Sequence, residues 1–231
     1  MPSRLTGRAV KLTWPDFLGS PPAGKAKELE GLKPGKSTFL AATFSDFTVR
    51  YGAGTRPLFD PVPGTTPPVF VLRDEVTLAT VFDGRRSWKV IDHLSDKGKD
   101  FLLDHEQGHY NISALMARDC FIDIMQLKAR TFASENEGVT AANGIFTRYH
   151  DALDKVQRKY DWDANHGEWY EPSMGLPSKG SEQVRWESYI QRAFTDERSP
   201  LVIAPDGATY KQRLMEIARA GIIARNETPP F

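Results

Sequence analysis

The chain of 231 residues contains a single cysteine, Cys120. It therefore has no partner for an intramolecular disulfide and no second thiol for a cysteine-based metal site. Because Cys120 follows a stretch of apolar residues with helical spacing, we interpret it as a core residue. Cysteine usage selects neither a reducing nor an oxidising compartment.

The sequence also lacks an excess of charge of either sign. Thirty basic and thirty acidic residues give a formal net charge of zero. No broad basic surface for nucleic acid or for an anionic membrane follows from this balance. With 40% hydrophobic and 26% charged residues, the composition is that of an ordinary globular protein. Its length fits one large domain, or a domain with an appendage.

Long hydrophobic runs are absent as well. No apolar stretch approaches the roughly 20 residues that a membrane-spanning helix needs. Basic residues occur near the N-terminus, at Arg4 and Arg8, but no apolar segment follows them. We therefore expect no signal peptide and no transmembrane segment. The corresponding location is the cytoplasm, or an exterior reached by a route that is not visible in the sequence.

Segments with the composition of strands precede those with helical spacing. We expect strands at 9–13, at 38–51 (one strand or a bent pair), at 69–82 (an antiparallel pair turning at 73–75) and at 87–90. A turn-dense loop with five prolines fills 52–68. This order predicts an α+β fold, with a mainly antiparallel, twisted sheet followed by helices.

Helical spacing of apolar residues begins near residue 97. We expect a helix from 97 to 132, broken at most once, and a loop at 134–138. A second helix carries an apolar stripe from Ile145 to Tyr160, a third follows a Ser181 cap, and a fourth covers 210–223. Residues 1–195 are interpreted as one domain, and 196–231 as a helical extension packed on it.

Histidine is scarce too, yet two of the five histidines lie within five residues of each other. His105, Glu106 and His109 form a His-Glu-x-x-His motif. On a helix, residues four apart share one face, so both imidazoles can direct a ring nitrogen at one zinc ion. The carboxylate of Glu106 could then take a proton from a zinc-activated water. Gly108, inside the motif, is explained by a neighbouring strand or substrate that approaches the helix backbone closely, or by simple tolerance of glycine.

A catalytic zinc ion has three protein ligands, and the motif supplies two of them. On a helix, His150 is more readily explained by packing or solvation. His166 lies in an irregular polar stretch just beyond a helix end, a place suited to direct one side chain at a site elsewhere. The residues themselves leave several acids open as alternatives: Glu135, Glu137, Asp161, Asp163, Glu168 and Glu171.

Several short segments together resemble a family of predicted zinc-dependent bacterial proteases, many of them secreted, whose function is unknown. The matching segments are Trp14–Phe17, Ser87–Trp88, Leu102–Ile112, Ala117–Arg118, Tyr160–Gly167 and Gln183–Trp186. The resemblance covers residues 10 to 195. It implies a zincin-like fold, a bound Zn²⁺ and His166 as the third ligand.

The chain departs from that pattern at three positions and in one segment. Tyr110 and Asn111 stand where the family usually has Phe and Asp, and Ala164 replaces a Thr. Residues 168–182 resemble an insertion between the His-Gly and Gln-x-x-Trp segments of the family. Carboxylates often orient metal-binding histidines, so an Asn at position 111 indicates a changed support around His109.

The resulting hypothesis is a zinc metallopeptidase, a hydrolase of peptide or protein substrates. His105, His109 and His166 bind zinc, and Glu106 is the general base that later protonates the leaving amine. The phenol of Tyr160 is the first candidate to stabilise the oxyanion, although packing explains this residue equally well. The strand at 76–82, if it is a sheet edge, could pair with an extended peptide.

Two non-catalytic alternatives stay open. In the first, the protein is a binding or effector module with a structural zinc, whose fourth ligand is Glu168 or Glu171. In the second, a protease-like scaffold without metal acts through protein interactions. Neither alternative needs a general base such as Glu106, so the presence of this residue favours the metallopeptidase hypothesis. A toxin or effector role would leave the chemistry unchanged.

Overall fold

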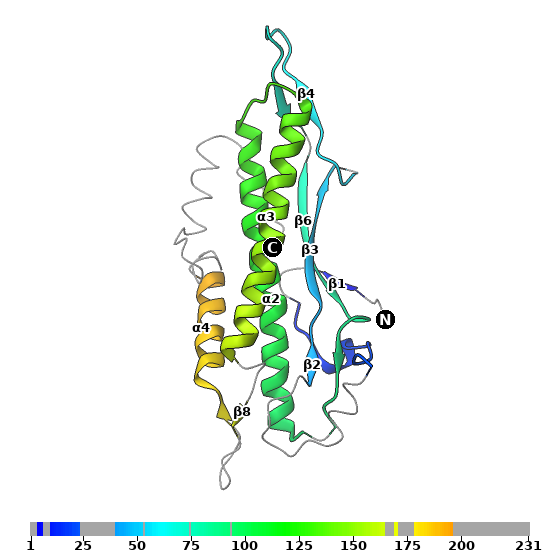
Figure 1. Ribbon diagram of the computed structural model, residues 1–231, viewed down its shortest axis with the longest axis vertical. Coiled ribbons are helices and arrows are strands. Elements are labelled where there is room, and N and C mark those ends of the chain that lie inside the picture. Colours follow the sequence, from blue (N-terminus) through cyan, green and yellow to red (C-terminus); the bar gives the residue numbers. More distant parts are fainter. Residues whose placement is uncertain are drawn as a thin grey trace.

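The computed structural model describes residues 4–6, 10–23, 40–52, 54–73, 75–92, 94–164, 169–170 and 178–195. Within these residues the protein has the predicted α+β organisation. Long helices lie beside a set of antiparallel strands (Figure 1). The molecule is elongated along the axes of its two longest helices, α2 and α3 (Figure 1).

The largest sheet has three antiparallel strands in the order β1-β6-β3. Their bounds are Arg4–Thr6 for β1, Ser45–Tyr51 for β3 and Val76–Asp83 for β6. β3 pairs with β6 along its whole length, from Ser45 opposite Phe82 to Tyr51 opposite Val76, and β1 pairs with the other side of β6 at 81–83. The expectation that 76–82 is an edge strand beside the site is therefore wrong, because β6 is the central strand.

The remaining strands form three short antiparallel pairs. They are β2 (Ala41–Ala42) with β7 (Trp88–Lys89), β4 (Phe59–Pro61) with β5 (Phe70–Leu72), and β8 (Trp169–Tyr170) with β9 (Ser178–Lys179). The bent pair at 38–51 and the strand at 87–90 are thereby confirmed. The predicted hairpin at 69–82 is wrong, since β5 and β6 pair with different strands.

Two other local predictions differ from the structure. The loop at 52–68 contains β4, because its apolar Phe59 is buried against the helices. The predicted strand at 9–13 is absent from its described part, 10–13, and a strand occurs earlier, at Arg4–Thr6. A short 3-10 helix, η1 (Trp14–Asp16), follows instead, and both the backbone N–H and the hydroxyl of Thr13 donate to Asp16.

The helix that carries the histidine motif is α2 (Asp96–Gln126), continued by a 3-10 turn, η2 (Leu127–Ala129). The side chain of Ser95 caps its N-terminus by accepting a hydrogen bond from the Gly98 N–H at 3.2 Å. The predicted helix at 97–132 is confirmed up to Ala129, whereas Phe132 lies beyond it in an antiparallel bridge with Phe70. α2 contacts β3 and β6 on one side and α3 and α4 on others, so nearly its whole circumference is buried from Tyr110 onward.

The second long helix, α3 (Glu135–Ala164), begins where a loop at 134–138 was expected. Ser134 accepts a hydrogen bond from the Glu137 N–H, and the Glu137 carboxylate accepts one from the Ala133 N–H. This reciprocal arrangement satisfies two helix-start donors. Gly138 is tolerated in the first turns because the Phe59 ring packs against it; a Cβ there would lie 2.6 Å from that ring.

The third helix, α4 (Ser181–Thr195), is confirmed as predicted. It lies beside the lower part of α2 and α3 in Figure 1 and buries Trp186, Ile190 and Ala193 against them. Arg118 of α2 donates to the carbonyl of Ala193 at 3.0 Å. The predicted helix at 210–223 lies outside the described residues.

The main core forms where α2 packs against the sheet, α3 and α4. Cys120 is fully buried there, which confirms its interpretation as a core residue. No described helix is long and apolar enough to cross a membrane.

Candidate metal centre

His105 and His109 lie one turn apart on α2, on the face turned towards α3. Both are buried, at 1% and 8% exposure. Their Nε2 atoms are 3.2 Å apart, so the two imidazoles direct the same ring nitrogen at one point. The four-residue spacing therefore brings the two imidazoles together on one face of the helix, as the sequence pattern predicted.

α3 places Asp161 opposite the two histidines. Its Oδ1 atom lies 2.9 Å from Nε2 of His109 and 3.3 Å from Nε2 of His105. These three side chains form a group whose potential ligand atoms all lie within 4.8 Å of one another. The buried group could hold a metal ion. Asp161 comes from the set of acids that the residues themselves left open as third ligand.

The second ring nitrogen of His109 is held by Gln157 of α3. The Nδ1–H donates to the Gln157 amide oxygen, and the Gln157 nitrogen donates to the His109 carbonyl at 2.9 Å and to Ser113 Oγ at 3.2 Å. Ser45 of β3 joins this group through a 2.8 Å hydrogen bond to Ser113. In the neutral imidazole with Nδ1 protonated, the lone pair of His109 is on Nε2, the atom that faces the candidate metal position.

His105 is held in the same way by α4. Its Nδ1 lies 3.0 Å from the amide oxygen of Gln183. Behind it, Tyr160 stacks on the imidazole with ring centroids 4.5 Å apart, and the phenol donates to the His105 carbonyl at 3.2 Å. Each imidazole therefore has a glutamine on Nδ1 and directs its Nε2 atom towards Asp161.

Glu106 faces a cavity of about 170 Å³ beside the histidines. It is only 2% exposed, and among the described residues its Oε2 atom has no hydrogen-bond partner. A buried carboxylate oxygen without a partner is costly, so this cavity fits a polar guest. The cavity is lined by Ala41, Ala42, Thr43, Phe44, Ser45, His105, Glu106, His109, Gln157 and Asp161.

The acids around His109 change its titration. Burial disfavours the imidazolium, but the hydrogen bond to Asp161 and the negative charges of Asp161 and Glu106 outweigh burial and raise the pKa of His109 to about 9. In the metal-free protein His109 therefore carries a proton at neutral pH. A metal ion would replace that positive charge in a pocket already arranged to hold one.

The other candidate ligands are placed apart from this group or lie outside the described residues. His166, Glu168 and Glu171 are outside. His150 stacks on Phe47 with ring centroids 4.5 Å apart, and its Nδ1 faces Asp46. The remaining acids make other contacts: Glu135 pairs with Arg56, Glu137 caps α3, and Asp163 binds Lys159 and Trp186.

Tyr160, the candidate for stabilising an oxyanion, is fully buried behind His105. Its hydroxyl contacts the His105 carbonyl and Gln183, and Tyr160 is not among the residues that line the cavity. Burial raises its pKa well above the ordinary value for a phenol. The ring also explains Gly108, because a Cβ at position 108 would meet the phenol oxygen and lie 2.7 Å from Cζ.

Sequence reasoning missed both glutamines. Gln183 belongs to the quoted Gln-x-x-Trp segment, whose Trp186 packs on Tyr160, yet that segment had no assigned role. Gln157 falls one turn before Asp161 on α3, and this four-residue spacing is the one signal that could have found it. Asn111, where the support of His109 was expected to change, instead accepts from Gln107.

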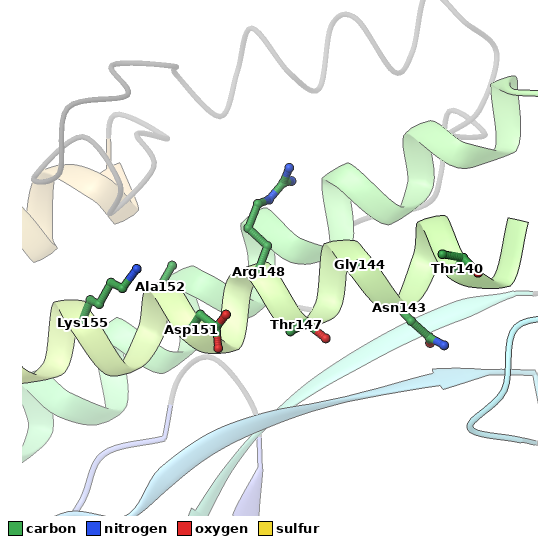
Figure 2. A pocket seen from close by; sticks show the side chains of 8 residues that line it. All are labelled: Thr140, Asn143, Gly144, Thr147, Arg148, Asp151, Ala152 and Lys155. Carbon is green, nitrogen blue, oxygen red and sulfur yellow. The ribbon is translucent and has the colours of Figure 1, made fainter. Parts of the chain in front are cut away.

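A larger hollow, of about 700 Å³, lies along another stretch of α3 and shares no residue with the cavity at Glu106. Figure 2 shows Arg148 and Lys155 extending from a different side of the helix than Asn143 and Thr147. Asp151 is the single residue of a metal-binding type in its lining. This hollow therefore lacks a cluster suited to metal binding.

No protein-family model matches the chain, and neither a curated protein nor a solved structure is significantly similar to it. The resemblance to zinc-dependent proteases therefore depends on the quoted motifs alone.

Proposed function

We propose that this protein is a zinc-dependent peptidase with a zincin-like arrangement of metal helix and sheet. One observation carries the proposal: two Nε2 atoms and one carboxylate oxygen converge beside Glu106, whose buried Oε2 has no partner among the described residues. The same helix supplies both histidines and the base, as in zinc hydrolases built on a His-Glu-x-x-His motif.

The spacing of the donor atoms supports zinc. Zinc binds imidazole nitrogen and carboxylate oxygen at about 2.0–2.2 Å, so two ligands of a tetrahedral site are about 3.3 Å apart. The three separations here are 2.9, 3.2 and 3.3 Å. Two histidines and a carboxylate leave a fourth position for water, which is the composition of a catalytic rather than a closed structural site.

Glu106 would accept a proton from the attacking water and return it to the leaving amine. A bound zinc ion supplies Lewis acidity, which makes a water molecule nucleophilic near neutral pH. Gln157 and Gln183 keep the two imidazoles oriented throughout by holding their Nδ1 protons. The cavity beside Glu106 gives the reacting carbonyl group a place next to both the base and the metal ligands.

The substrate would lie along the segment from β2 to β3, which forms one wall of the cavity. The carbonyls of Leu40 and Phe44 accept from Val90 and Asp83, so these groups face the β6–β7 side. In an extended chain alternate residues face opposite ways, so the peptide group of Thr43 points away from that side. An extended peptide could pair there, which makes this segment the replacement for the predicted edge at 76–82.

The test combines metal analysis with a protease assay on purified protein. Wild-type protein should bind one zinc ion and cleave an unstructured protein, with loss of cleavage after chelation and recovery when zinc is restored. Glu106→Gln should keep its zinc and lose activity by about 10²–10⁴-fold. Asp100→Asn, an exposed acid on the same helix, is the matched control and should keep both.

Three results would overturn the proposal or its metal assignment. Full activity in Glu106→Gln would remove the general base. A protein that binds zinc tightly but cleaves no substrate, before or after chelation, would instead fit the structural-zinc binding module. Recovery of iron rather than zinc would reject the metal assignment, since two histidines and a carboxylate also suit ferrous iron.

A further inference from the structure

Three side chains form a hydrogen-bonded chain that ends on His105. Lys179 of β9 donates to Glu187 at 2.7 Å, Glu187 accepts from the Gln183 amide nitrogen at 2.9 Å, and the Gln183 oxygen faces His105 Nδ1 at 3.0 Å. Lys179 is also paired with Asp104 of α2 at 2.6 Å. The network thus joins β9 and α4 to the turn of α2 that carries the motif.

The amide of Gln183 fits its site in two orientations, with oxygen and nitrogen exchanged. Glu187 distinguishes them, because a carboxylate accepts hydrogen bonds and cannot donate one. The nitrogen of Gln183 must therefore face Glu187, and its second hydrogen goes to the hydroxyl of Tyr160 at 2.9 Å. The amide oxygen is left to face His105.

This orientation determines which nitrogen of His105 carries the proton. An amide oxygen only accepts, so the neutral imidazole must be protonated on Nδ1. The Nε2 lone pair then faces the Nε2 atom of His109 and the carboxylate of Asp161. In the opposite orientation the amide nitrogen would donate to Nδ1, so the proton of His105 would lie on Nε2. Nε2 would then donate to Asp161 and have no lone pair for a metal ion.

Among the described residues, no other neighbour of Gln183 supplies this discrimination. The Tyr160 hydroxyl lies within hydrogen-bond distance of both amide atoms of Gln183, at 2.9 and 3.2 Å, so it tolerates both orientations. Gln157, the counterpart on His109, differs because its nitrogen faces the His109 carbonyl, which only accepts. Gln157 is thus oriented by the backbone of α2, whereas Gln183 depends on a carboxylate one turn further along α4.

We propose that Glu187 is a positioning residue that fixes the Gln183 amide and, through it, the His105 tautomer that can bind a metal. The proposal rests on the proposed function in that His105 is taken as a zinc ligand. It assigns a role to a residue that contacts neither the ligands nor the cavity.

Three variants test this role. Glu187→Met keeps the length of the side chain but removes the acceptor. Glu187→Gln removes the charge but keeps an acceptor oxygen, and Lys179, which only donates, should hold that oxygen towards Gln183 because both groups donate to the same Glu187 oxygen. Glu182→Met, which takes one acid from the same helix and disturbs only an exposed contact with Arg185, is the matched control. Glu187 is partly exposed, so all three variants should fold, and thermal unfolding checks this.

The first measurement is made without metal. Nitrogen NMR of histidine-labelled protein, followed as pH is raised into the alkaline range, reports which ring nitrogen of His105 keeps its proton in the neutral imidazole. Wild type, Glu187→Gln and Glu182→Met should carry the proton on Nδ1, and Glu187→Met should shift it to Nε2. In a chelator competition, Glu187→Met should then bind zinc about 10- to 100-fold more weakly, with the other two close to wild type.

Retention of the Nδ1 proton in Glu187→Met would overturn the proposal, as would an equal change in Glu182→Met. Weaker zinc binding without a change of tautomer would also overturn it, since a merely structural role predicts that result. Because the NMR measurement uses metal-free protein, it decides the role of Glu187 even if the wild type binds no zinc and the proposed function fails.

Discussion

Gln157 makes two opposed contacts with His109: its amide oxygen accepts the Nδ1 proton, and its nitrogen donates to the His109 carbonyl at 2.9 Å. One side chain of α3 thereby holds both the ring and the backbone of a residue on α2. The consequence is a His109 whose Nε2 atom is directed at Asp161, one turn beyond Gln157 on the same helix.

Replacing Gln157 should therefore weaken metal binding without removing any ligand. In Gln157→Met the Nδ1 proton loses its acceptor, and we expect zinc affinity to fall by about 10- to 100-fold. Gln157→Glu keeps an acceptor for the Nδ1 proton but loses the donor to the His109 carbonyl, and it should bind zinc more tightly than Gln157→Met. Chelator competition measures both, and equal affinities in the two variants would contradict the proposed role of this hydrogen bond.

Asp161 and Asp163 provide a direct test of the third ligand, since they are two residues apart on α3 and only Asp161 faces the histidines. Asp161→Asn should bind zinc more than about tenfold more weakly than wild type, because an anionic ligand is lost. Asp163→Asn should keep its zinc and lose modest stability, since Asp163 contacts Lys159 and Trp186 instead.

Chelator competition on the Asp161 and Asp163 variants should include His166→Ala, because His166 is the ligand that the family resemblance implies. Loss of zinc in both Asp161→Asn and His166→Ala would indicate that both side chains bind the metal. Wild-type affinity in Asp161→Asn, together with loss in His166→Ala, would reject Asp161 as a ligand.

The helices could be predicted because their signals are local. The apolar spacing from residue 97 onward and the Ser181 cap led to helices within a few residues of the observed ones. The early start of α3 was missed even though Ser134 and Glu137 have capping-box spacing, since the glutamates and Gly138 were interpreted as a loop. Strand partners were harder, because pairing depends on contacts distant in sequence: β6 pairs with β3, not with its neighbour β5.

The candidate site shows the same division. His105, Glu106 and His109 follow from spacing within one helix. Asp161, Gln157 and Gln183 reach the site only through the packing of α3 and α4 on α2, which a single sequence does not encode in any short pattern. Gly108 is intermediate: its position predicted a close approach, and the structure identifies the approaching group as the Tyr160 ring.

Gly108→Ala should destabilise the protein although alanine favours helices. A Cβ at this position would overlap the Tyr160 ring, and overpacking of this kind costs about 1–3 kcal/mol. Gly144→Ala on α3 is the control, because no atom lies within 4 Å of its added Cβ. That variant should gain about 0.5–1 kcal/mol from helix propensity. Urea unfolding without metal measures both, and a stabilising Gly108→Ala would reject the packing of Tyr160 described above.

Between pH 6.5 and 9, stability should fall with rising pH in the metal-free protein and stay nearly constant in the zinc-loaded protein. In the metal-free protein the pKa of His109 is raised from 6.5 to about 9, so its contribution is full below pH 6.5 and is lost as pH rises towards 9. Zinc binding displaces that proton, so zinc affinity should increase about tenfold per pH unit from pH 7 to 9 and then level off. The difference in Tm between zinc-loaded and metal-free protein should consequently widen over this range.

The control for this pH effect is His109→Gln, which lacks the titrating imidazole. Comparison with wild type isolates His109 from other groups that titrate between pH 6.5 and 9. The metal-free variant should lose the decline in stability seen for wild type in that range. The same pH dependence of stability in wild type and His109→Gln would contradict the raised pKa of His109. It would also contradict the 2.9 Å contact between His109 and Asp161.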